Sequence, residues 1–166
     1  MIIRPYKDKT PTIGKDTFVA ETAAVIGDTI IGSQCSVWYS AVVRGDDKPI
    51  VIGDRVNIQD CAVIHGDSPV HIGNDITIGH NATIHGATIH DHVLVGMGST
   101  ILDGTVVGHH SIVAAHALVL TNTTIGPYEL WGGVPAKFIK KVTPKMAEAI
   151  DHGIQIYVDM AAEYNQ

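Results

Sequence analysis

Aliphatic residues recur at every sixth position along most of this chain, a period that fits neither an α-helix nor an alternating β-strand. The series comprises Ile13, Val19, Val25, Ile31, Val37 and Val43; then Ile52, Ile58 and Ile64; then Ile72, Ile78 and Ile84; and finally Ile89, Val95, Ile101, Val107, Val113, Val119 and Ile125. The register gains three residues after Val43 and two after Ile64, and it loses one after Ile84.

Each group of six residues, or hexad, provides one short strand and one turn. The aliphatic side chain points inward, a small residue fits beside it, and Gly or a polar residue occupies the bend. Three hexads complete one triangular coil, so the series predicts about six coils stacked on one another. We therefore predict an all-β solenoid of parallel strands over residues 1–142.

The period changes in the last part of the chain, where apolar residues fall at the three- and four-residue spacings of an amphipathic helix. These residues are Met146, Ala149, Ile150, Ile154, Tyr157, Met160, Ala161 and Tyr164. Thr143 followed by Pro144 is typical of a helix start, whereas Gly153 weakens the helix by about 1 kcal/mol. We predict that residues 143–166 form a C-terminal α-helix that packs along one face of the solenoid.

Composition narrows the setting. A formal net charge of −6 argues against a nucleic-acid partner or an anionic membrane surface. No apolar run approaches the roughly 20 residues of a membrane span, and the N-terminus lacks the apolar segment of a signal peptide, so we expect a cytoplasmic protein. Two cysteines, Cys35 and Cys61, are too few for a disulfide framework, and we interpret both as small buried side chains.

Counting hexads rather than residues shows which polar side chains share a column, because residues three hexads apart lie about 4.8 Å above one another. One column follows the aliphatics Val43, Ile64 and Ile84 and contains Arg44, His65 and His85. A second column follows Ile58, Ile78 and Val95 and contains Asp60, His80 and Met97, with Gln59 next to Asp60. The polar residues thus gather in two columns at matching heights.

The columns predict a metal site. His65 and His85 lie on adjacent coils, where two imidazoles can reach one ion at the Zn–N distance of about 2.0–2.1 Å. His80 lies on another face of the triangle, so it would join them only from a neighbouring subunit, in a homotrimer with a site at each interface. Three protein ligands leave one position for water, as in catalytic zinc sites. We predict Zn²⁺, although Fe²⁺ or Co²⁺ suits the same ligands.

The other seven histidines lie at positions expected for turns and surfaces, and we interpret them as polar residues without a metal. They are His71, His90, His92, His109, His110, His116 and His152.

Four segments together resemble the γ-class carbonic anhydrases of the hexapeptide-repeat superfamily. They are V43-R-G-D46, N57-I-Q-D60, His65 and I78-G-H-N-A-T-I-H85. The resemblance implies a left-handed parallel β-helix and a zinc site shared across a trimer interface by His65, His80 and His85. It also implies an intersubunit ion pair between Arg44 and Asp46, and an orienting role for Gln59 toward the metal-bound solvent. Asn57, Asp60 and Tyr157 match further residues around that site.

The implied reaction is the hydration of CO2 to bicarbonate by a metal-bound hydroxide. One departure concerns proton transfer: the prototype enzymes carry a glutamate on a long acidic loop, but this chain has only H65-G-D-S-P-V-H71 and no Glu between His65 and His85. Proton transfer to buffer would need Asp47 or a chain of waters instead.

Two alternatives remain open. The segment G132-G-V-P-A-K137 also resembles one that is common in hexapeptide-repeat acyltransferases, which use coenzyme A as the acyl donor. The three histidines would alternatively hold a closed metal site in a trimeric binding scaffold that has no catalytic activity.

Overall fold

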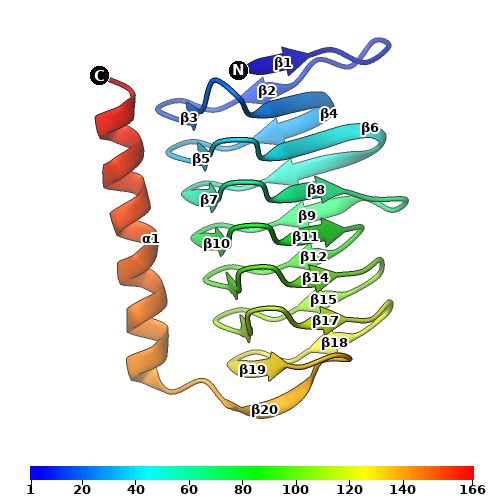
Figure 1. Ribbon diagram of the computed structural model, residues 1–166, viewed down its shortest axis with the longest axis vertical. Coiled ribbons are helices and arrows are strands. Elements are labelled where there is room, and N and C mark those ends of the chain that lie inside the picture. The colour runs from blue at the N-terminus through cyan, green and yellow to red at the C-terminus, as the bar shows by residue number, and fades with distance from the viewer.

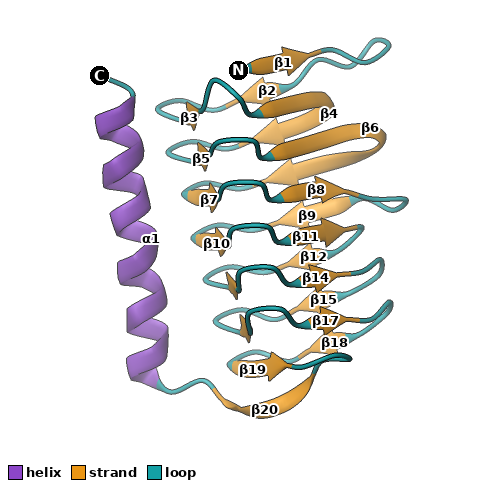
Figure 2. Cartoon of the chain, viewed as in Figure 1, coloured by secondary structure: helices purple, strands orange, loops and turns teal.

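The computed structural model describes residues 1–166 and shows a solenoid of parallel strands with one helix, α1 (Pro144–Tyr164), running along its length (Figure 1). The helix begins at one end of the stack and returns to the other, so both chain termini lie at the same end. Strands occupy three faces, and turns form the corners between them (Figure 2). The parallel solenoid and its single C-terminal helix confirm the predicted fold class, a left-handed parallel β-helix.

The strands form two sheets. The 12-stranded sheet covers two faces and contains β1 (Ile2–Arg4), β2 (Thr12–Ile13), β4 (Ala24–Ile31), β6 (Val42–Ile52), β8 (Val63–His65), β9 (Val70–Ile72), β11 (Thr83–His85), β12 (Thr88–Ile89), β14 (Thr100–Ile101), β15 (Val106–Val107), β17 (Leu118–Val119) and β18 (Thr124–Ile125). The 8-stranded sheet forms the third face and contains β3 (Phe18–Val19), β5 (Ser36–Val37), β7 (Val56–Ile58), β10 (Ile76–Ile78), β13 (Leu94–Val95), β16 (Ile112–Val113), β19 (Glu129–Gly132) and β20 (Lys137–Lys141).

Two strands are longer than the hexad pattern predicts. β4 and β6 continue through the corner between the two faces of the larger sheet, and β6 pairs with β8 by its first half and with β9 by its second. All three changes of register lie at this same corner: within β6, between β8 and β9, and between β11 and β12. We call it the variable corner; it comprises residues 44–49, 65–69, 85–87 and 102–105.

The hexad aliphatics form the core. Ile58, Ile64, Ile78 and Ile84 are fully buried and stack in register on their neighbours in the adjacent coils. Each buried aliphatic side chain stabilises the fold by about 1.5–3 kcal/mol relative to an exposed one. The stacking continues through the whole solenoid, because every coil repeats the same inward positions.

The two cysteines differ. Cys35 is buried, as predicted, and burial raises the pKa of its thiol to about 11. The prediction for Cys61 is wrong, because this side chain is exposed. Cys61 has a φ of +60° at a corner of the coil, next to the inward-pointing Ala62, so its own side chain points outward.

The helix packs on the 8-stranded sheet, where it contacts β3, β5, β7 and β10. The Thr143 hydroxyl accepts a hydrogen bond from the Met146 backbone N–H at 3.4 Å and caps the N-terminus. Ile150, Ile154 and Ala161 are the buried residues of the inner face.

No helix of the chain has both the length and the hydropathy that crossing a bilayer requires.

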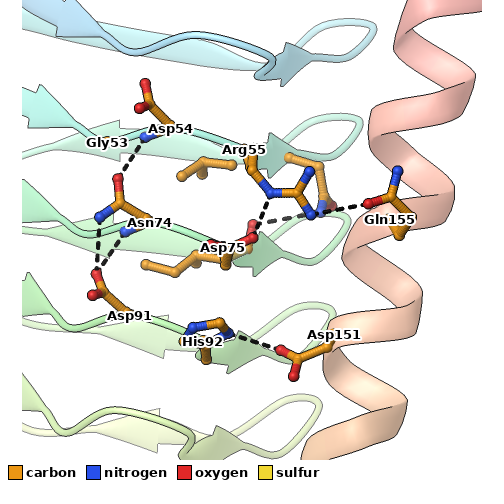
Figure 3. Close-up of polar contacts among 12 residues, drawn as sticks. Gly53, Asp54, Arg55, Asn74, Asp75, Asp91, His92, Asp151 and Gln155 are labelled. Atoms are coloured by element: carbon orange, nitrogen blue, oxygen red, sulfur yellow. Dashed lines mark hydrogen bonds and ion pairs between the residues drawn. The ribbon is translucent and has the colours of Figure 1, made fainter.

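Polar side chains also attach the helix to the solenoid (Figure 3). Arg55 Nε lies 2.7 Å from an Asp75 carboxylate oxygen, and Arg55 Nη2 donates to Gln155 of the helix at 3.1 Å. His92 Nδ1 lies 2.8 Å from Asp151 of the helix. These contacts attach two coils of the solenoid to neighbouring turns of α1.

A ladder of short side chains runs beside these contacts. The Asn74 side-chain oxygen accepts from the Asp54 backbone N–H at 2.9 Å, and the Asp91 carboxylate accepts from the Asn74 backbone N–H at 2.7 Å (Figure 3). We call this edge of the solenoid the helix corner; it comprises Asp54, Arg55, Asn74, Asp75, Asp91, His92, His109 and His110.

Candidate metal centre

His65 and His85 occupy the last positions of β8 and β11, which pair in parallel register. Ile64 and Ile84 point into the core, so strand alternation turns both histidines outward. His65 Nδ1 lies 3.4 Å from His85 Nε2, and the rings are tilted by 55°. Two ligands about 2.05 Å from a tetrahedral ion are separated by about 3.4 Å, so this spacing suits one metal ion between them.

Asp46 contacts the His65 ring nitrogen that faces away from His85. Its carboxylate lies 3.2 Å from His65 Nε2 and accepts from Arg44 Nη1 at 2.6 and 2.7 Å. The hydrogen bond from Arg44 is the main reason that the pKa of Asp46 lies below its usual value. Asp46 is therefore ionised near neutral pH and fixes the His65 ring. Arg44 and Asp46 form this pair within one chain, and their contact across subunits stays a prediction.

Asp103 contacts the His85 ring nitrogen that faces away from His65. The sequence pattern did not predict this contact. The Asp103 carboxylate contacts His85 Nδ1 and also accepts from the Ser68 hydroxyl at 2.9 Å. Partial burial raises the pKa of Asp103, but the hydrogen bonds from His85 and Ser68 outweigh it and leave a net lowering. The sequence does contain a signal for Asp103. It lies two positions after Ile101, as Gly86 lies two positions after Ile84 in the adjacent coil, so the two residues stack. A Cβ on Gly86 would overlap the Asp103 carboxylate.

His80 belongs to a second polar cluster at another corner. Its Nδ1 lies 2.9 Å from Asp60, and its backbone N–H donates to Gln59 Oε1 at 3.1 Å. Gln59 Nε2 donates to Asn57 at 3.1 Å, and Asn57 in turn donates to the Thr77 hydroxyl at 2.9 Å. Asn57 and Gln59 are buried, so this chain of hydrogen bonds fixes the Gln59 amide.

Tyr157 of α1 lines a cavity of about 400 Å³ together with Gln59, His80 and Met97. Burial, and then the negative charge of Asp60, raise the pKa of the Tyr157 hydroxyl. The tyrosine is therefore protonated near neutral pH. It reaches the second cluster, and its ring packs edge-on against Trp38 with the ring centroids 5.7 Å apart; a role for Tyr157 in the reaction stays a prediction.

The two clusters do not meet within one chain. The turn at His80 and Asn81 lies at one corner of the coil, and strand β11 runs from it to His85 at the next corner. The donor atoms of His65, Asp67 and His85 lie within 4.8 Å of one another, and His80 is not in this group. A three-histidine site therefore requires His80 from another subunit.

The three predicted ligands share one feature: one ring nitrogen of each histidine contacts an aspartate carboxylate. Asp46 holds His65, Asp60 holds His80 and Asp103 holds His85. A carboxylate behind a histidine fixes its tautomer and orientation and raises its basicity as a metal ligand. The arrangement is therefore suited to binding a metal with the remaining nitrogens.

Comparison with known proteins agrees with the repeat and the site. The profile of the bacterial transferase hexapeptide family matches residues 86–121. A carbonic anhydrase from Geobacillus kaustophilus is 37% identical, over 98% of this chain and 91% of that protein. This chain belongs to the γ-carbonic-anhydrase-like family of hexapeptide-repeat proteins. Within this family, the mitochondrial γ carbonic anhydrase 2 of Arabidopsis thaliana is 45% identical over 93% of the chain.

The γ-carbonic-anhydrase-like chain spans 58% of the length of that plant relative. Among solved structures, a hexapeptide transferase family protein from Anaplasma phagocytophilum superposes with a TM-score of 0.96 at 34% identity, covering 98% of each chain. The fold is thus shared closely by proteins that bear different functional names, and the function must be argued from the site.

Proposed function

We propose that this protein is a γ-type carbonic anhydrase that hydrates CO2 to bicarbonate in a homotrimer. His65 and His85 of one subunit and His80 of a neighbouring subunit would hold a metal ion, for which we propose Zn²⁺, with Fe²⁺ or Co²⁺ suited to the same ligands. The observation that carries the proposal is the facing pair of nitrogens on His65 and His85, each ring held from behind by a carboxylate.

The residues present fit such an ion. The 3.4 Å between the facing nitrogens matches a tetrahedral pair of ligands, and neutral imidazole suits Zn²⁺. When bound at a site with an open position, Zn²⁺ lowers the pKa of water to about 7. Asp46 and Asp103 contribute by holding the two rings in place, and Arg44 keeps Asp46 ionised.

Gln59 would orient the reacting groups. Asn57 accepts from its amide nitrogen and thereby turns the amide oxygen toward the His80 backbone, at the wall of the cavity. The exposed Met97 side chain lines the same cavity and offers CO2 an apolar surface. Asp60 holds the His80 ring and Tyr157 closes the side next to the helix, so these residues position groups and exclude water.

Stopped-flow CO2 hydration tests the proposal, using protein purified without oxygen and with the metal counted per subunit on the same sample. We expect one metal per subunit and a rate that His85→Ala abolishes. Since the short connector contains no glutamate, we also expect the rate to rise with the concentration of imidazole buffer. A full complement of metal without hydration would reject the proposal and direct work to acyl-CoA substrates or to a non-catalytic scaffold.

The shared site has its own test. His80→Ala and His85→Ala subunits are each unable to assemble a complete three-histidine site, but in a mixed trimer an interface can combine intact His80 from one chain with intact His65 and His85 from another. We therefore expect refolded mixtures of the two inactive variants to regain part of the hydration activity. Mixtures that form trimers and stay inactive would place His80 outside the site.

A further inference from the structure

Asp67 lies on the short connector between β8 and β9, where the prototype enzymes carry their long loop. Its carboxylate is within 4.8 Å of ligand atoms of both His65 and His85. The nearby carboxylates already have partners: Asp46 pairs with Arg44, and Asp103 with His85. The Asp67 side chain is exposed and has no ion pair within the chain, so its carboxylate oxygens are available to a ligand.

The connector is held firmly on both sides of Asp67. The Ser68 hydroxyl donates to the Asp103 carboxylate at 2.9 Å, and its oxygen also lies 3.1 Å from the Gly86 carbonyl oxygen. On the other side, a Cβ on Gly66 would overlap the Gly86 backbone nitrogen, so the loop lies directly on the next coil. Because Gly66 and Ser68 are both anchored to the coil below, the Asp67 backbone is fixed beside the two histidines.

We propose that Asp67 is a metal ligand and completes a set of two histidines and one carboxylate on a single subunit. The proposal rests on the proposed function only in taking His65 and His85 as ligands. Two histidines and one carboxylate with open positions form a ligand set typical of Fe²⁺ sites, and it also suits Co²⁺. A subunit with these three ligands would bind metal before it meets a neighbour.

This ligand set has a consequence for the choice of metal. With His80 of a neighbouring subunit, the site would have four protein ligands. Four ligands saturate tetrahedral Zn²⁺ as in structural zinc sites, whereas a six-coordinate ion keeps positions open for solvent. With Asp67 as a fourth protein ligand, Fe²⁺ or Co²⁺ would replace Zn²⁺ as the expected ion of the proposed function, because both accept six ligands.

Co²⁺ titration of the full-length, metal-free protein tests the proposal by calorimetry and by visible absorption, without reference to activity. His80→Ala should retain Co²⁺ binding through the three ligands in the chain. The double variant H80A/D67N should bind at least about tenfold more weakly than H80A and show an altered Co²⁺ spectrum. Asp67→Glu in the H80A background, which keeps a carboxylate, should recover part of the loss.

The matched control is Asp8→Asn in the H80A background, which removes the same charge from an exposed aspartate and should leave affinity unchanged. Thermal unfolding monitored by circular dichroism checks that each variant is folded. If H80A/D67N binds Co²⁺ with the affinity and spectrum of H80A, Asp67 is not a ligand. CO2 hydration measured on wild-type protein separates the two proposals. If Co²⁺ binding depends on Asp67 but the wild type does not hydrate CO2, only the proposed function is rejected. If the wild type hydrates CO2 but H80A/D67N binds Co²⁺ as H80A does, only the role of Asp67 as a ligand is rejected.

Discussion

Two corners of the solenoid carry columns of polar residues, but they use them differently. At the helix corner, His92 contacts Asp151 of α1, and His110 stacks between the rings of His92 and Tyr128 at 4.5 and 4.7 Å. At the variable corner, His65 and His85 also contact carboxylates, but their second nitrogens face each other across 3.4 Å. A stacked column of histidines is therefore not a metal site by itself.

The two corners differ in the carboxylates that contact the histidine rings and in the distance between the facing ring nitrogens. His109 and His110 also face each other, but their Nδ1 atoms lie 3.0 Å apart, the length of a direct N–H···N hydrogen bond. No carboxylate contacts either ring. A carboxylate behind each ring, together with a gap that fits an ion, distinguishes the variable corner from a column that only stabilises the helix.

His85→Ala should produce the largest effect at the variable corner. The variant removes one of the two facing ligands, so we expect metal content near zero by elemental analysis. The side chain points outward from the coil, so the midpoint of thermal unfolding of the metal-free protein should stay close to that of the metal-free parent. His92→Ala, the matched change at the helix corner, should retain its metal; loss there would erase the contrast.

Asp103→Asn should have the next largest effect. It removes the carboxylate behind His85 and leaves the histidine in place, and loss of such a partner weakens metal binding by about 10–100-fold. Competition with a chelator measures this change. Asp151→Asn, which removes the carboxylate behind His92, is the control and should leave the affinity unchanged. Equal affinities in wild type and Asp103→Asn would mean that Asp103 only stabilises the turn.

Asp151→Ala should act on stability alone. It breaks the contact with His92 that binds α1 to the solenoid, but the Asp151 side chain is half exposed, so we expect a loss of about 0.2–1 kcal/mol in the free energy of unfolding. Urea denaturation of the metal-free protein measures it, with metal affinity as the second readout. A change in metal affinity without a change in stability would contradict the division of roles between the corners.

The smallest effect is a dependence on pH at the helix corner. Burial, and then the charges of His92 and His109, lower the pKa of His110 below its usual 6.5, against the opposing effect of Asp151 and Asp91. As pH falls, the unfolded chain takes up this proton first, so stability declines below about 6.5 until pH passes the lowered value.

Urea midpoints at pH 7.5 and 5.5, compared between wild type and His110→Asn, isolate this contribution. The wild type should lose more stability on acidification than the variant, because only the wild type retains the titrating ring. Equal losses in the two proteins would mean that His110 titrates normally in the folded state.

The period of six predicted the strands and their register because every coil buries one aliphatic residue per face. It predicted that His65 and His85 stack, because each follows a core aliphatic residue, and these aliphatic residues stack on one another in adjacent coils. It did not predict the long strands β4 and β6, because pairing through a corner depends on backbone hydrogen bonds and not on which side chains are apolar.

The parts of the site that were missed lie beyond the strands. Asp103 and Asp67 follow the last aliphatic of their hexads by two and three residues, in turns whose length varies. Counting hexads gives the height of a coil, but it does not give the path of a turn or the reach of its side chains. Cys61 was misjudged for a related reason, because a left-handed backbone at the corner turned it outward.

The variable corner also bears on how such a protein can change over time. Every coil of a different length places its extra or missing residues there, and lengthening a surface loop costs little because each doubling adds only about 0.6 kcal/mol of closure entropy. Loops beside the proposed metal site can therefore be exchanged while the stack beneath them keeps its register. Natural variation and laboratory grafting can both vary the chemistry of this edge on an unaltered scaffold.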